Sequence, residues 1–267
     1  MILFDSFPGG KQNAVTFSYD DGMVTGDERL IALFRKYGLR ATFHLNGLFA
    51  DTAPETLRAR YDGFEIAAHG KEHRSLSMLP VTSIIEELTE NRNVLERAVR
   101  GPVQGLSYAN GDFTQEMLPL LRSLGFVYSR TTRNRVDRPI PLFGLPEDFM
   151  QWAPTCHQSR GQECADKFVA SLDGYFSTPR LLDIWGHSHE LRTEEDWAKM
   201  EKICATVAQN DRVWYATNGE IYNYVMAQRA LVPAADESFI YNPTRTDVWF
   251  HRNNVCYCVH GGETLFF

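Results

Sequence analysis

The chain has 267 residues, 43% of them hydrophobic, which is enough for one large α/β domain or two small ones. The net charge of −7 and the absence of a long Lys or Arg run argue against nucleic acid or an anionic membrane as a partner. Five cysteines without paired metal-type spacing favour a reducing compartment. With no export signal at the N-terminus and no apolar run of roughly eighteen residues, we expect a soluble, cytoplasmic protein.

Segments typical of strands and helices alternate along most of the chain. β-Branched and aromatic residues predict strands at Ala14 to Tyr19, Leu39 to Leu45, Phe64 to Ala68, Val103 to Tyr108, Phe126 to Arg130, Leu181 to Trp185 and Val213 to Ala216. Helical periodicity predicts helices at Glu28 to Tyr37, Thr82 to Val99, Gln115 to Leu124, Cys164 to Tyr175, Trp197 to Gln209 and Glu220 to Ala230. The alternation predicts parallel βα units that close into a distorted (β/α)7-type barrel.

Two segments depart from this alternation. Four prolines between Pro139 and Pro154 predict an irregular loop across the barrel rim, called the proline-rich loop below. After residue 230 the pattern changes to short strands separated by turn residues. We therefore expect a barrel over residues 1–230 and a short C-terminal β extension over residues 231–267. Asn218 is expected to be the N-cap of the last barrel helix.

Polar residues gather at the carboxyl ends of the predicted strands, where barrels of this kind carry their reactive groups. Asp20 and Asp21 end the first strand, and His69 and His73 follow the third. Adjacent carboxylates repel each other unless a cation or a proton separates their roles. If the segment between the two histidines turns helical, both imidazoles share a face and can bind one cation. The pattern predicts a metal site with one free carboxylate base, as in a hydrolase.

Other polar side chains are expected near this site. His187 ends an apolar strand and can protonate a leaving amine at the barrel mouth. His189 and Glu190 follow closely, and either can orient His187 or touch the substrate. Trp152 and His157 combine an aromatic ring with an imidazole, which suits stacking on a sugar and bonding to its hydroxyls. Packing in the core is the alternative for this pair.

In order and spacing, three motifs resemble the polysaccharide deacetylase family, which is carbohydrate esterase family 4. They are Ser18 to Gly22, His69 to His73, and the strand that ends at His187, and the resemblance extends over residues 14 to about 190.

The resemblance implies a role for each matching residue. Asp20 is the expected catalytic base and His187 the expected general acid. Asp21, His69 and His73 are the expected ligands of one divalent metal. Zinc suits two imidazoles and one carboxylate, while Co²⁺, Ni²⁺ and Mn²⁺ stay open.

One motif departs from the family. Its usual form is Arg-x-Pro-aromatic-Gly, and residues 107–111 read Ser-Tyr-Ala-Asn-Gly. The arginine that Ser107 replaces tethers the catalytic aspartate in the family, so we expect a substitute cation, with Arg130 as the candidate, or hydrogen bonds alone. The backbone N–H near Asn110 matches the position that helps to bind the oxyanion, and Tyr108 is expected to line the same wall.

Three functions follow from these motifs. The resemblance implies a metal-dependent hydrolase that removes acetyl groups from an N-acetylated or O-acetylated carbohydrate. Some relatives open other carbon–nitrogen bonds in small amides such as cyclic ureides, which is the second alternative. A non-catalytic glycan-binding relative is the third, favoured by the departure at Ser107 and opposed by the intact Asp20 and His187. Two other classes of hydrolase are disfavoured. The sequence lacks the other metal-binding motifs of a two-metal phosphatase, and it lacks the nucleophile elbow of a serine hydrolase.

Overall fold

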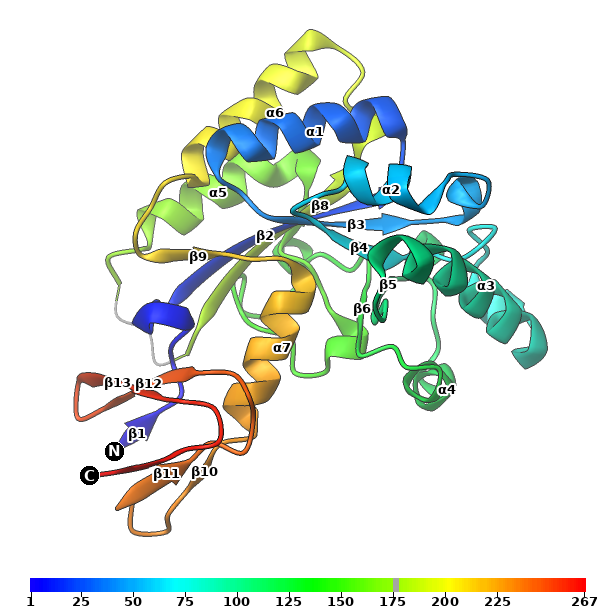
Figure 1. Cartoon of the computed structure of the whole chain (residues 1–267). Helices are drawn as coiled ribbons and strands as arrows, with labels where there is room; N and C mark the ends of the chain where they lie inside the picture. The colour runs from blue at the N-terminus through cyan, green and yellow to red at the C-terminus, as the bar shows by residue number, and fades with distance from the viewer. Residues whose placement is uncertain (175–177) are drawn as a thin grey trace.

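The computed structural model describes residues 1–174 and 178–267. A parallel sheet forms the centre, in the strand order β6-β5-β4-β3-β2-β8-β7, and β9 also pairs with β2 (Figure 1). These strands are β2 (Asn13–Asp21), β3 (Ala41–Leu45), β4 (Glu65–Ala68), β5 (Gly105–Ser107), β6 (Tyr128–Arg130), β7 (Cys156–His157), β8 (Arg180–His187) and β9 (Val213–Tyr215). The predicted (β/α)7-type barrel is confirmed.

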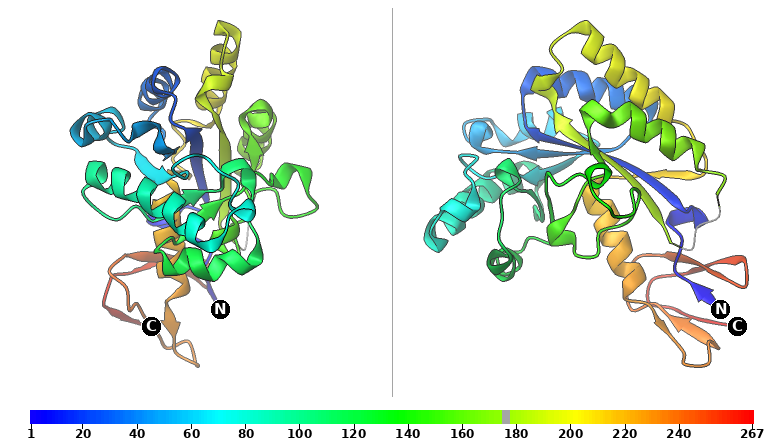
Figure 2. Two further views of the ribbon diagram at one scale, coloured as in Figure 1. Left: turned by 90° about the vertical axis from the view of Figure 1, so that its right-hand side faces the viewer. Right: turned by 180° about the vertical axis from the view of Figure 1, so that it is seen from behind.

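Helices connect the strands and cover the outside of the sheet. They are α1 (Val24–Tyr37), α2 (Pro54–Arg60), α3 (Val81–Val99), α4 (Leu118–Ser123), α5 (Gly161–Ala170), α6 (Glu194–Val207) and α7 (Asn218–Arg229). Helices α1, α5 and α6 lie together on one side (Figures 1 and 2). The predicted end of the fourth helix at Tyr175 lies outside the described residues. No helix in the described part of the chain is long and apolar enough to cross a membrane.

Strand β2 is buried on both faces and separates the helix layer from the barrel interior. Phe17 and Tyr19 pack on Phe34 of α1, with ring centroids 4.8 and 5.9 Å apart. Because side chains alternate along a strand, Ser18 and Asp20 point the other way, into the barrel. An apolar outer face and a polar inner face on one strand therefore bring a carboxylate into the core.

The end of the proline-rich loop forms backbone hydrogen bonds with two strands of the sheet. Near its end, the backbone N–H of Trp152 donates to the carbonyl oxygen of Ser129, and Thr131 N–H donates to the carbonyl oxygen of Trp152. A little further along, Thr155 N–H donates to the carbonyl oxygen of Asp183 in β8. The end of the loop thus connects β6 to β8, and the sequence pattern did not predict the short strand β7 that follows.

Two small antiparallel sheets form the β extension, in the orders β1-β12-β13 and β10-β11-β14. Their strands are β1 (Ile2–Leu3), β10 (Val232–Pro233), β11 (Phe239–Tyr241), β12 (Val248–Arg252), β13 (Val255–Val259) and β14 (Thr264–Phe266). The first strand of the chain pairs with β12, so both termini lie in this region (Figure 1). Residues 2 and 3, which the expected division assigns to the barrel, therefore pair with the extension, and the division at residue 230 stays a prediction.

The start of α7 also differs from the expectation. Thr217, not Asn218, is the N-cap, and it forms a capping box with Glu220. The Asn218 side chain is buried in the barrel, where its Oδ1 accepts a hydrogen bond from Thr16 Oγ1 at 3.0 Å. Asn218 therefore bonds across the barrel and does not cap its own helix.

The packing of α1 on β2 gives the first prediction. Phe34→Ala should lower the free energy of unfolding by about 3–5 kcal/mol, because it opens a cavity beneath Phe17 and Tyr19. Urea unfolding checks this. Arg35→Ala, at the next and exposed position, should change the same quantity by less than about 1 kcal/mol. Equal losses in the two variants would contradict this account of the core.

Candidate active site

The parallel register brings polar side chains to one end of the barrel. Asp20 of β2 lies beside His44 of β3 on one side and beside His187 of β8 on the other. Ser107 of β5 lies beside Arg130 of β6. Because the carboxyl ends of parallel strands meet at one rim, residues far apart in the sequence share one site.

Asp21, His69 and His73 form a compact cluster. Their ligand atoms all lie within 4.8 Å of one another. The Nε2 atoms of His69 and His73 lie 3.5 and 3.6 Å from Asp21 Oδ1, and the two rings are 4.7 Å apart. The cluster therefore has three possible ligand atoms around one small space.

The protonation of His69 can be inferred from its contacts. Its Nδ1 lies 3.0 Å from the carbonyl oxygen of Ser107, which can only accept a hydrogen bond, so Nδ1 carries the proton. The Nε2 atom is buried and has no hydrogen-bond partner among the described residues. A lone pair on this atom, directed toward Asp21, fits a divalent cation.

The segment that carries the two histidines is a loop and not the expected helical turn. Gly70 and His73 have positive φ angles of 83° and 55°. Two buried side chains of α3 hold the loop: Asn91 Oδ1 accepts from the N–H groups of His69 and Gly70, and Glu87 Oε1 accepts from that of Glu72. The histidines therefore converge because α3 holds the loop, which a helical spacing rule does not predict.

Asp20 is only 2% exposed and is surrounded by donors. The Arg130 guanidinium donates to Oδ2, and Ser107 Oγ donates to Oδ1 at 3.1 Å. Burial opposes ionisation and is the largest single effect, but the charge of Arg130, together with His69 and His44, holds the pKa of Asp20 well below its usual range. Arg130 itself is 1% exposed and also donates from Nε to Ser18 Oγ at 3.0 Å. The proposed substitute arginine thus lies against the carboxylate.

His44 is a residue that the motifs did not reveal. It is fully buried, and its Nδ1 lies 3.3 Å from Asp20 Oδ1. Burial lowers the pKa of His44 despite the neighbouring carboxylate, so this ring is neutral around pH 7. The in-register pairing of the two strands was the signal that could have revealed it.

His187 approaches the cluster from the opposite side of Asp21. Its Nε2 lies 3.9 Å from Asp21 Oδ2, and its Nδ1 lies 3.1 Å from Glu190 Oε1. Burial alone would lower the pKa of His187, but the hydrogen bond and charge of Glu190, with Asp20 and Asp21, raise it above its usual value. His189 lies nearby, with its Nδ1 3.8 Å from Asp21 Oδ2.

The structure does not bring all predicted substrate contacts to the surface. Tyr108 and Trp152 are 1% and 0% exposed, so these side chains have no face to offer a sugar. Tyr108 Oη donates to the carbonyl oxygen of Met150 at 2.8 Å. Asn110 is exposed at the first turn after β5, with φ of 58°, and His157 lies beside Glu190. The core-packing alternative therefore holds for Trp152, and Tyr108 is corrected in the same way.

Strand order, helices and strand-end cluster together define a barrel of the (β/α)7 deacetylase class. Residues 8–129 match the family model described as "Polysaccharide deacetylase". A protein of Arthroderma benhamiae, "Probable peptidoglycan-N-acetylglucosamine deacetylase", is 32% identical over 94 residues. That match covers 34% of this chain and only 22% of the relative, so it spans less than a quarter of the relative's length.

Solved structures with the same fold include two bacterial proteins. A "putative polysaccharide deacetylase" from Mycobacterium smegmatis has a TM-score of 0.64 at 21% identity, covering 84% of this chain and 93% of that one. A family 4 carbohydrate esterase from Streptomyces lividans, in complex with acetate, has a TM-score of 0.50 at 17% identity, covering 74% and 88%. The resemblance in the motifs is confirmed over residues 8–129, which match the polysaccharide deacetylase family model.

The Asp21, His69 and His73 cluster gives a prediction about metal. We expect about one equivalent of divalent metal per chain in the wild type after incubation with Zn²⁺. His69→Ala should lose it while the protein stays folded, because His69 supplies the buried Nε2. Elemental analysis and circular dichroism check both points. His189→Ala, a neighbouring imidazole outside the cluster, should keep its metal; unchanged occupancy in His69→Ala would place the site elsewhere.

The Asp20 and Arg130 pair gives a prediction about stability. Arg130→Met should lower the free energy of unfolding by about 3–5 kcal/mol at neutral pH, because it leaves a buried carboxylate unpaired. Urea unfolding of Arg130→Met and of the double variant Asp20→Asn/Arg130→Met checks this. The double variant should recover part of the loss, since its amide carries no charge. Equal losses would show that the two side chains are not coupled.

The same pair should also make stability depend on pH. Because folding depresses the pKa of Asp20, its contribution is present above the ordinary aspartate pKa of about 3.9 and is lost as pH falls through the folded-state value. The unfolding free energies of wild type and Arg130→Met should therefore converge at acid pH.

Proposed function

We propose that this protein is a metal-dependent hydrolase that removes acetyl groups from an N-acetylated or O-acetylated carbohydrate. One observation carries the proposal: a buried, ionised carboxylate lies 3.8 Å from His69 Nε2 of the cluster, and an imidazole lies 3.9 Å from Asp21 Oδ2 of the cluster. These two groups are Asp20, whose lowered pKa keeps it ionised, and His187, whose raised pKa favours its protonated form.

Asp21, His69 and His73 would hold the metal. Two imidazoles and one carboxylate suit zinc and leave open coordination positions. A bound divalent metal supplies Lewis-acid chemistry, namely activation of water and polarisation of the acyl carbonyl. The fit is supported by the unpartnered Nε2 of His69 and by the carbonyl of Ser107, which keeps that nitrogen free of a proton.

Asp20 accepts the proton of the attacking water in this proposal. The Arg130 guanidinium keeps the carboxylate ionised and, with Ser107, fixes its orientation. The contact between Arg130 and Asp20 therefore supports an active enzyme, because it answers the loss of the usual motif arginine, which was the main argument for a non-catalytic relative. Asn110 remains the candidate for a backbone N–H that stabilises the oxyanion.

His187 donates a proton to the departing amine or alcohol. Its raised pKa increases the protonated fraction at neutral pH, and its Nε2 faces Asp21. A proton donor and a proton acceptor that both lie next to the cluster provide both transfers that hydrolysis of an amide requires.

Replacement of the base tests this proposal. Asp20→Asn should lower kcat by a factor on the order of 10²–10⁴ while metal stays bound, because the amide cannot accept the proton of water. The measurement is acetate release from N-acetylglucosamine oligomers and from O-acetylated xylan with Zn²⁺ present. Ring opening of a cyclic ureide, which releases no acetate, is followed separately as the test of the small-amide alternative. Asp51→Asn, an exposed position, is the matched control. A near-normal rate in Asp20→Asn would rule out this base.

A further inference from the structure

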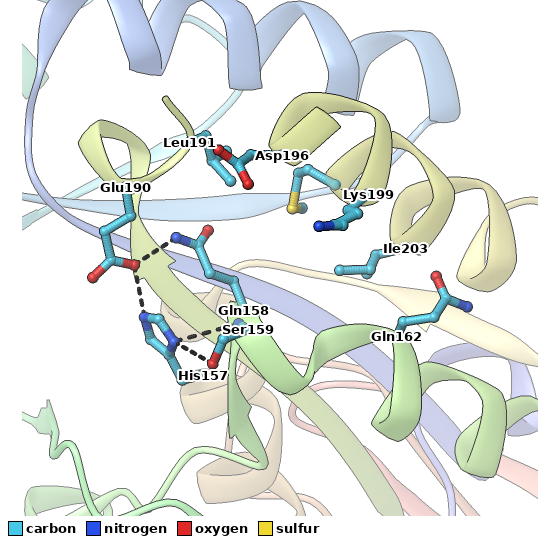
Figure 3. A pocket seen from close by; sticks show the side chains of 10 residues that line it. His157, Gln158, Ser159, Gln162, Glu190, Leu191, Asp196, Lys199 and Ile203 are labelled. Atoms are coloured by element: carbon cyan, nitrogen blue, oxygen red, sulfur yellow. Dashed lines mark hydrogen bonds and ion pairs between the residues drawn. The ribbon is translucent and has the colours of Figure 1, made fainter. Parts of the chain in front are cut away.

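Glu190 lies at the centre of a hydrogen-bonded group behind His187. Its Oε2 lies 2.9 Å from His157 Nε2 and 2.7 Å from Gln158 Nε2, and its Oε1 lies 3.1 Å from His187 Nδ1. His157, Gln158 and Glu190 also form one wall of a pocket of about 220 Å³ beside α6, shown in Figure 3. The carboxylate therefore joins His187 to two side chains that come from a different part of the chain.

The tautomer of His157 follows from its neighbours. The backbone N–H of Ser159 donates to His157 Nδ1 at 3.3 Å, so this nitrogen carries a lone pair (Figure 3). In the neutral ring the proton then lies on Nε2, from which it is donated to Glu190. His157 is thus a hydrogen-bond donor directed at Glu190.

The same reasoning applies to His187. A carboxylate can only accept, so His187 Nδ1 also carries a proton toward Glu190. With these hydrogen bonds made, both nitrogens that face Glu190 carry a proton. The three side chains His157, Glu190 and His187 therefore form a hydrogen-bonded unit.

Glu190 needs such partners to stay in place. It ends a short 3-10 turn, Ser188–Glu190, and its side chain is 36% exposed, so without contacts it would rotate freely. Gln158 is itself held, because its Oε1 accepts from Tyr19 Oη at 2.9 Å and its Nε2 also donates to the carbonyl oxygen of His187. His157 and Gln158 together fix both the position and the rotation of the carboxylate.

We propose that His157 is a positioning residue that acts through Glu190: it holds the carboxylate against His187 Nδ1, so that His187 presents Nε2 to the substrate. The catalytic meaning of this unit rests on the proposed function, in which His187 is the acid. The geometry itself does not depend on it. His157 then contributes to proton transfer and not to sugar binding, in contrast to the role that the sequence suggested.

A ring-nitrogen measurement tests the geometry independently of activity. Long-range ¹H–¹⁵N spectra, recorded about two pH units above the ordinary histidine pKa of ~6.5, report which nitrogen of His187 carries the proton. The His187 signals are assigned by their loss in His187→Asn. The wild type should show the proton on Nδ1. Glu190→Ala should shift the population toward Nε2, and His157→Ala should do so to a smaller extent.

Two further variants make this test specific. His157→Gln keeps an N–H near the position of Nε2 and should restore the wild-type pattern. Lys199→Gln changes a charge in the wall of the same pocket without touching Glu190 and should change nothing. A wild-type His187 pattern in His157→Ala would overturn the proposal.

Kinetics with an accepted acetylated substrate give the second readout. General acid catalysis contributes on the order of 10²–10⁴-fold to a rate. If His187 loses its orientation in His157→Ala, kcat should fall about tenfold or more while KM stays nearly unchanged. In His157→Gln, kcat should return toward the wild-type value. A rise in KM alone would make His157 a substrate contact and overturn the proposal. If no acetylated substrate is turned over, the proposed function fails, while the ring measurement still decides the positioning role.

Discussion

The site depends on a carboxylate that is ionised inside the barrel. An unpaired charge at the depth of Asp20 would cost several kcal/mol, so the surrounding strands have to supply an opposite charge and hydrogen-bond donors. Arg130 crosses from β6 to supply that charge. Small polar side chains, Ser18 and Ser107, provide room and hydrogen bonds for the pair. The arrangement of the other groups follows from this one buried ion pair.

Three of the imidazoles around Asp21 present the same ring nitrogen to it. His69 donates from Nδ1 to the Ser107 carbonyl, and His187 donates from Nδ1 to Glu190. In both rings Nε2 is left to face Asp21, as it does in His73. Hydrogen bonds to the rest of the protein thus determine which nitrogen each of these two rings offers, as the proposed metal ligand and the proposed proton donor require.

Segments that carry no motif hold the side chains of the site in place. Helix α3 holds the loop of His69 and His73 through Glu87 and Asn91, and the end of the proline-rich loop connects β6 to β8. The short β7 that follows carries His157 toward Glu190. The β extension pairs with the first strand of the chain and lies away from the site at the far end of α7 (Figure 1).

The sequence by itself determined the barrel, because alternating strand and helix periods extend over most of its length. It also brought Asp20, Asp21, His69, His73 and His187 to one rim, because polar residues that follow apolar parallel strands meet there. The motif order predicted the deacetylase family, and the position of Arg130 at a strand end made it a candidate partner of Asp20.

Only the tertiary structure decided which side chains surround these residues. His44 occurs inside an apolar strand, and its contact with Asp20 arises from strand register. Trp152 and Tyr108 were candidates for substrate contact in the sequence, yet both are buried. The pairing of His157 with Glu190 joins strand β7 to the turn after β8, which local patterns do not relate. Periodicity reports which face of an element is apolar, whereas contacts between distant segments depend on packing, register and loop path, which no local pattern contains.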